Sequence, residues 1–228
     1  MNRRFNFLIT KEIQMSLSEK KLEKNGIELI GWDEIFNPVP NWNKYFLSNY
    51  GRLLHMNKKK ELKLVPAHPN NAGYLKYNLS KPTRKYNGKK LRDKNGKTKG
   101  NHLNCYAHRL VAQLYVPILY PEYYDIDIND LEVHHRDKDP SNNYYKNLMY
   151  LLKVHHKFVD SIKKMGSYNT VTGRVYKYND IERLANKATL NVIEFIDYLR
   201  FAESEKDGKW NVYNINGYHI AVEYFKSK

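Results

Sequence analysis

The sequence predicts an α+β protein that begins with a small module built around a short antiparallel sheet. Residues 45–54 have the pattern of a strand, an Asn-Tyr-Gly turn and a second strand. Near the end of the chain, Asn216-Gly217 separates two apolar segments, as the turn of a two-residue hairpin does. Residues 106–115 are instead apolar at helical spacing, and Pro117 follows them. Antiparallel strands and helices are therefore both expected.

The first part of the chain is expected to divide into an extension and a module. Residues 1–26 are charged, show capping-box spacing at Ser16 to Glu19, and are assigned to an N-terminal extension. Residues 27–100 form the module, with a further strand at 73–79. Within it, residues 81–99 carry nine basic residues and one acid, so this basic loop is expected to be an exposed, mobile hairpin extension or loop.

The second part of the chain is expected to contain a core at residues 101–165 and a C-terminal region at 166–228. His108, at the start of the helix at 106–115, is interpreted as a structural residue. In the C-terminal region two helices are predicted at 179–187, with Asn179 as N-cap, and at 189–201. These two helices form either a helix-turn-helix or a packed helical hairpin, and the acidic residues on the second favour the hairpin.

Composition favours a polyanionic partner. The 228 residues include 39 Lys and Arg against 24 Asp and Glu, which gives a net charge of +15. Neutralisation of phosphates by such charge supplies most non-specific nucleic-acid affinity, although a merely basic protein is the alternative. The lone Cys105 excludes an intramolecular disulfide and a cysteine-rich zinc site. No apolar run reaches the roughly 20 residues of a membrane span, so a soluble protein of the bacterial or phage-infected cytoplasm is expected.

Residues 131–160 contain the candidate catalytic and metal-binding residues. They predict a strand at 131–135, a polar loop, a short strand near 148–152 and a helix from about residue 153. Neighbouring side chains of a strand point to opposite faces, so His134 and His135 should diverge. His156 and Asp160 are four residues apart on the helix and should share one face, where they could hold one ion. The sequence therefore predicts a metal site on two strands and a helix.

The order and spacing of these residues resemble the ββα-metal (His-Me finger) motif of HNH endonucleases. His135 and Asn147 are twelve residues apart, and Asn147 and His156 are nine apart. Asn142-Asn143 before Asn147 also resembles a signature of phage homing enzymes. Upstream, residues 32–54 resemble the modular DNA-binding domain that precedes such nucleases, and residues 108–112 resemble the helix between the two. The resemblance covers about residues 31–160.

The resemblance implies a role for each matching residue. His135 would be the general base that takes a proton from the attacking water, and Asn147 would orient the loop or ring of His135. His134 and His156 would hold one divalent cation. Asp160 lies where related toxins have a third histidine, and is a candidate third ligand.

The sequence also departs from the pattern of many phage HNH homing enzymes, which have Asp at the position of His134 and Asn at that of His156. The two histidines make the site more similar to bacterial DNase toxins. One divalent ion is expected, Mg²⁺ or Mn²⁺, and the imidazoles also suit Zn²⁺ or Ni²⁺. If the helix began one residue earlier, His155 would replace His156 as a ligand.

The resulting hypothesis is a homing-type DNA endonuclease of a phage or mobile element that nicks double-stranded DNA as a monomer or weak dimer, with no membrane partner. Alternatives are an RNA or non-specific nuclease, a non-catalytic nucleic-acid-binding protein and a phage particle component. The expected DNA-binding residues are basic side chains of the module, the basic loop and the metal-site loop: Arg52, Arg84, Lys85, Lys89, Lys90, Arg92, Arg136 and Lys138.

Overall fold

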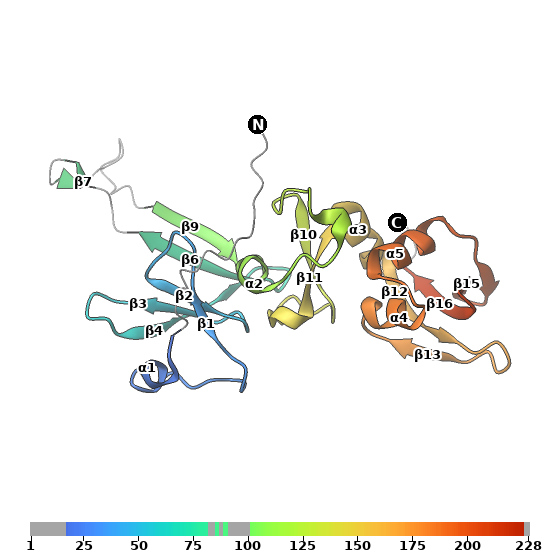
Figure 1. Ribbon diagram of the computed structural model, residues 1–228, viewed down its shortest axis with the longest axis horizontal. Helices are drawn as coiled ribbons and strands as arrows, with labels where there is room; N and C mark the ends of the chain where they lie inside the picture. The colour runs from blue at the N-terminus through green and yellow to red at the C-terminus, as the bar shows by residue number, and fades with distance from the viewer. Residues whose placement is uncertain (1–16, 82–84, 87–88, 91–100, 226–228) are drawn as a thin grey trace. The chain divides into compact units, whose positions relative to one another are not determined.

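A computed structural model of the chain describes residues 17–81, 85–86, 89–90 and 101–225 (Figure 1). Its contacts divide the chain into two compact units. Unit 1 comprises Met1–Tyr115 and Asn143–Tyr145, and unit 2 comprises Val116–Asn142 and Lys146–Lys228. This division differs from the expected boundaries at residues 100 and 165, because the strand and helix after residue 100 belong to unit 1.

Unit 1 contains short antiparallel sheets and two helices. A four-stranded sheet has the order β1 (Phe36–Pro38), β2 (Tyr45–Ser48), β3 (Leu53–Met56) and β4 (Leu62–Val65). A three-stranded sheet has the order β5 (His68–Pro69), β6 (Leu75–Lys81) and β9 (Asn101–Tyr106), and β7 (Lys85–Tyr86) pairs with β8 (Lys89–Lys90). The helices are α1 (Glu19–Glu23) and α2 (Ala107–Tyr115). The predicted hairpin at 45–54 and helix at 106–115 are both present.

The core of the four-stranded sheet includes the first helix. Leu22 of α1 is buried in one cluster with Phe36, Phe46, Leu54 and Leu62. Residues 17–26 therefore belong to the folded unit and are not an extension from it. Ser18 is the N-cap of α1 and its side chain makes no capping hydrogen bond, whereas Ser16 lies outside the described residues.

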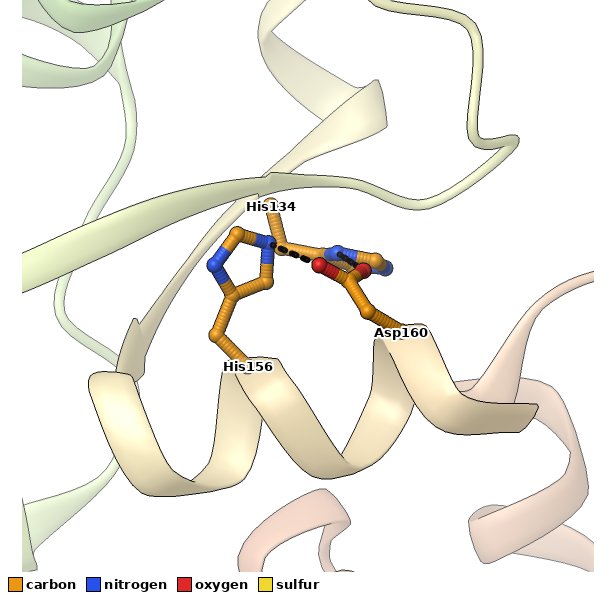
Figure 2. A group of neighbouring side chains, drawn as sticks. All are labelled: His134, His156 and Asp160. Carbon is orange, nitrogen blue, oxygen red and sulfur yellow. Dashed lines mark ion pairs between the residues drawn. The ribbon is translucent and has the colours of Figure 1, made fainter. Parts of the chain in front are cut away.

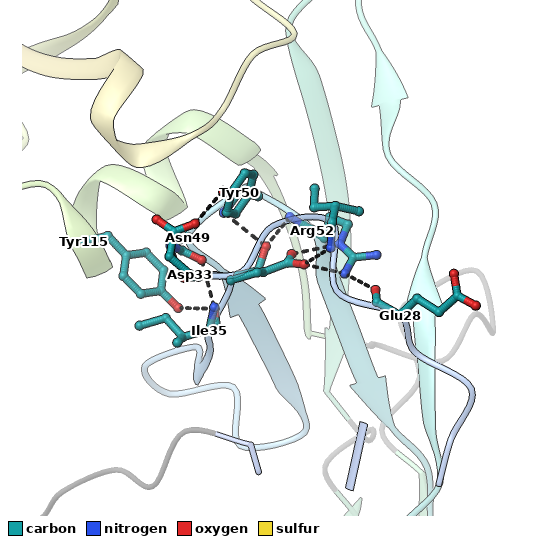
Figure 3. Close-up of polar contacts among 10 residues, drawn as sticks. Glu28, Asp33, Ile35, Asn49, Tyr50, Arg52 and Tyr115 are labelled. Atoms are coloured by element: carbon teal, nitrogen blue, oxygen red, sulfur yellow. Dashed lines mark hydrogen bonds and ion pairs between the residues drawn. The ribbon is translucent and has the colours of Figure 1, made fainter. Parts of the chain in front are cut away.

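The residues that resemble the modular domain fix the loop before β1 (Figure 3). Arg52 donates to both carboxylate oxygens of Glu34, at 2.8 and 2.6 Å, and to the Glu28 carbonyl. The side-chain amide of Asn49 accepts from the backbone N–H of Ile35 and donates to the Asp33 carbonyl. Through these contacts Asn49 and Arg52 hydrogen-bond to the loop before β1, so both residues have a structural role.

Unit 2 consists of a two-stranded ladder, a five-stranded sheet and three α-helices. The ladder pairs β10 (Leu131–His135) with β11 (Leu148–Leu152), and α3 (Lys153–Ser161) follows directly. The sheet has the order β13 (Val175–Tyr178), β12 (Ile162–Tyr168), β16 (Tyr218–Tyr224), β15 (Trp210–Ile215) and β14 (Glu205–Asp207). The other helices are α4 (Ile181–Lys187) and α5 (Val192–Phe201), with 3₁₀ turns at Pro121–Tyr123 and Tyr145–Asn147. No helix among the described residues is long and apolar enough to span a bilayer.

The C-terminal elements follow the sequence patterns with small shifts. Asn216 and Gly217 have φ of 50° and 82°, the left-handed pair that a type I′ hairpin requires. The N-cap of α4 is Asp180, which corrects the expected Asn179 by one residue. Helix α5 begins at Val192 and not at 189, because Asn191 and Glu194 form its capping box. Five residues of α5 are buried, as in a packed helical hairpin: Val192, Ile193, Phe195, Ile196 and Leu199.

Candidate metal centre and catalytic loop

The β10–β11 ladder places two adjacent histidines on opposite faces. Backbone pairing sets His134 opposite Met149 and His135 opposite Leu148. Because side chains alternate along a strand, His134 shares its face with Glu132, while His135 lies on the other face. Both imidazoles are buried, at 4% and 5% exposure.

His134, His156 and Asp160 form a group in which one ligand atom from each lies within 4.8 Å of the others. Figure 2 shows His156 and Asp160 projecting from the same side of α3 toward His134 on β10. The Asp160 carboxylate lies 3.8 Å from His134 Nδ1 and 3.6 Å from His156 Nε2. The two imidazole rings meet edge to face, with centroids 5.1 Å apart. Strand β10 and helix α3 thus bring three donor side chains together.

The electrostatics of the group suit a cation. Burial lowers the pKa of His134 from 6.5 to about 3, and electrostatic effects of His156 and Lys138 act in the same direction. His134 is therefore neutral at pH 7, as an imidazole must be to ligate a metal. Two imidazoles and one carboxylate form a donor set that divalent transition ions favour. The three residues fit the metal that the HNH resemblance implies.

Glu132, which the sequence analysis did not identify, contacts a member of the candidate metal group. Its carboxylate lies 2.6 Å from Nδ1 of His156. If Nδ1–H donates to this carboxylate, Nε2 keeps the lone pair and points it toward Asp160. Sequence could have given a signal, since Glu132 and His134 are two apart on a strand and must share a face.

His155 is occupied elsewhere in unit 2. Its Nδ1 lies 2.7 Å from the Tyr123 hydroxyl, and its Nε2 lies 3.2 Å from a carboxylate oxygen of Asp197. Tyr123 also accepts a hydrogen bond from the backbone N–H of Leu152. With α3 beginning at Lys153, His156 and not His155 faces the group.

Asn147 fastens the loop that joins the two strands. Its side-chain oxygen accepts from the backbone N–H of Asp137, and its Nδ2 donates to the Asp137 carboxylate and the Asn142 carbonyl. Although desolvation raises it, hydrogen bonds from Asp139, Asn147 and Asn142 leave the pKa of Asp137 below its usual value. Asn147 therefore lies apart from the metal group and holds the chain that leaves His135.

The expected DNA-binding residues divide into three sets. Arg52 pairs with Glu34, and Arg136 pairs with Glu182 and more distantly with Asp180. The ammonium group of Lys138 donates to the Ile162 carbonyl. Their guanidinium or ammonium groups thus contact the protein, and their expected binding to DNA stays a prediction. Arg84 and Arg92 lie outside the described residues, as do the side chains of Lys85, Lys89 and Lys90.

No protein-family model matches the chain, and no curated protein matches it. A comparison with solved structures finds the HNH homing endonuclease I-HmuI, in a structure concerned with its DNA binding and cleavage. The two chains share 17% sequence identity, with 85% of this chain and 99% of the other covered at a TM-score of 0.35. A TM-score this low does not equate two folds, so the likeness by itself assigns neither fold nor activity.

Proposed function

We propose that this protein is a metal-dependent HNH endonuclease that hydrolyses phosphodiester bonds in DNA. The observation that carries the proposal is the group of His134, on strand β10, with His156 and Asp160, on helix α3. The resemblance of residues 31–160 to HNH enzymes supports the same function, and the net charge of +15 suits a nucleic-acid substrate.

Each residue has a role in the proposed reaction. His134, His156 and Asp160 would hold one divalent cation, which when bound supplies a positive charge to the phosphoryl and leaving oxygens. His135 takes a proton from the attacking water, so that an oxygen–phosphorus bond forms as the bond to the 3′ oxygen breaks. Asn147 keeps the loop after His135 in place. The leaving 3′ oxygen takes up a proton from solvent water, so the products are a 5′ phosphate and a 3′ hydroxyl.

The site is proposed to cut one strand at each encounter. One metal group and one histidine base can act on a single phosphodiester at a time, so a monomer is expected to nick duplex DNA. The homing type and the phage or mobile-element origin rest on the sequence resemblance.

A supercoiled plasmid with Mg²⁺ or Mn²⁺ tests the function. Wild-type protein should convert it to the open-circular form, and His135→Ala should slow this by about 100-fold or more, because a general base contributes that much. His219→Ala, which changes a partly buried histidine outside the metal group, is the matched control and should cut normally.

Two outcomes would count against the assignment. If the wild type binds the plasmid but leaves it uncut with both metals, the protein is a non-catalytic nucleic-acid-binding protein. If His135→Ala cuts as fast as the wild type, His135 is not the base.

A further inference from the structure

A pocket rich in lysine lies on unit 2 beside the catalytic loop. Its volume is about 140 Å³. The loop contributes Asp137 and Lys138, and strands β12 and β13 contribute the remaining wall. The lysines that line it are Lys138, Lys163, Lys164 and Lys177. Four lysines thus line a concavity large enough for a phosphate group.

Part of this positive charge faces an acid: Lys163, together with Lys164 opposite Glu223 in the β12–β16 ladder, lowers the pKa of the Glu223 carboxyl. Lys163 donates to Glu223 at 2.8 Å, so its charge is compensated within the sheet. Among the described residues, Lys164 and Lys177 are exposed and form no ion pair within 4.0 Å. The only acid that lines the pocket, Asp137, is engaged by Asn142 and Asn147. Like charges gathered in this way repel one another unless an anion binds between them.

Lys138 connects the pocket to the metal group. It lies in the catalytic loop, which begins after β10 at residue 136, in a left-handed conformation with φ of 63°, and its ammonium group reaches the Ile162 carbonyl at the start of β12. Desolvation lowers the pKa of Lys138, and the carboxylate of Asp160, in the metal group, acts in the opposite direction, so Lys138 lies within electrostatic reach of the metal group. An anion in the pocket would therefore lie close to the proposed reaction centre.

We propose that this lysine pocket binds a second backbone phosphate of the nucleic acid whose scissile phosphate meets the metal group. This inference rests on the proposed function and adds a second site at which the protein would bind the DNA backbone. Lysine offers a point charge and reads no base edge, so the contact is independent of sequence. Strands β12 and β13 then form part of the DNA-binding surface, in addition to the basic residues that the sequence suggested.

Binding of a labelled DNA duplex, measured in EDTA at several salt concentrations, tests the pocket. Lys164→Gln and Lys177→Gln should each weaken binding about threefold, and the double variant should reduce the slope of log K against log salt by about one, for the one phosphate that the pocket is proposed to bind. Lys206→Gln is the matched control, because this exposed lysine lies on β14 at the opposite edge of the sheet. Its binding and salt slope should change much less.

The outcomes separate this inference from the proposed function. Unchanged affinity and slope in the double variant would overturn the pocket, as would an equal effect of Lys206→Gln, which would indicate net charge alone. A lysine effect that differed between two unrelated duplex sequences would contradict a backbone contact. Plasmid cleavage is followed separately: an inactive wild type with the lysine effect intact would reject the nuclease but keep the phosphate site.

Discussion

At the scale of single residues, the surroundings of each imidazole determine what it can do. His134 is buried and kept neutral beside Asp160, and His156 has its Nδ1 close to Glu132. His155, next to His156 in the chain, contacts Tyr123 and Asp197 and has no free side toward the group. Neighbouring histidines thus have separate ligand and structural roles.

Removal of Glu132 should weaken metal binding. Without its carboxylate, His156 loses the partner that fixes its tautomer and ring orientation, and such losses lower metal affinity about 10–100-fold. Titration of Mn²⁺ into Glu132→Ala by calorimetry should show this decrease. Glu205→Ala removes an exposed glutamate of β14 and should bind as the wild type does. Equal affinities of Glu132→Ala and wild type would exclude Glu132 from the site.

The metal-free protein should lose stability in acid through His134. Because its pKa falls from 6.5 to about 3 on folding, the unfolded chain takes up this proton first. The contribution is complete above pH 6.5 and decreases from there toward pH 3, by about 1.4 kcal/mol for each pKa unit. Thermal unfolding in EDTA should therefore depend less on pH in His134→Leu than in wild type. Parallel pH profiles would show that His134 is not buried in the neutral form.

At the scale of elements, one face of α3 carries candidate metal ligands and another packs against the rest of unit 2. One presents His156 and Asp160 to His134, and the other is fixed by His155, which contacts Tyr123 from the preceding segment and Asp197 from α5. The N–H of Leu152, at the start of α3, donates to the same Tyr123 hydroxyl. This network fixes the position of α3, and with it the positions of the candidate metal ligands His156 and Asp160.

Loss of the Tyr123 hydroxyl should destabilise unit 2. Tyr123→Phe leaves the Leu152 N–H and His155 Nδ1 without this partner in a buried place, which costs about 1–3 kcal/mol. Urea unfolding should show a lower midpoint. Tyr124→Phe is the matched control, because Tyr124 is 63% exposed, and its midpoint should stay unchanged. If the two variants unfolded at the same urea concentration, the network would not hold α3.

At the scale of the whole molecule, the net charge and the number of candidate metal groups bear on the proposed binding and cleavage of DNA. The net charge of +15 favours binding to any duplex, although Arg52 and Arg136 are paired with acids inside their units. The described residues contain one group of three candidate metal ligands. Under the proposed function, a polyanion would be attracted broadly and one phosphodiester would be cleaved at each encounter.

Cleavage should therefore proceed by single nicks. In a time course on supercoiled plasmid, the open-circular form should accumulate before linear DNA appears, at a rate proportional to protein concentration. Gel electrophoresis at several protein concentrations checks this. Linear DNA formed directly, with a second-order dependence on protein, would instead indicate a dimer that cuts both strands together.

The local patterns of the sequence determined which elements form and which residue types converge. The strands Leu131–His135 and Leu148–Leu152 and the helix after them were predicted, because alternation and helical spacing are properties of the backbone. The sequence also showed that the helix now called α5 carries Glu194 and Asp197, with Arg200 as its one basic residue. The order of His134, His135, Asn147 and His156 likewise came from the sequence alone.

Only the tertiary structure decided which partner each side chain has. The contact of Glu132 with His156 joins residues 24 apart, and the pairing of Arg136 with Glu182 joins residues 46 apart. Neither separation follows a helix or strand period, so no local pattern encodes it. The same holds for the place of α1 in the core of unit 1, which depends on burial of Leu22 against distant strands. The local sequence determined the type and order of the candidate site residues, and tertiary folding determined which side chains contact one another.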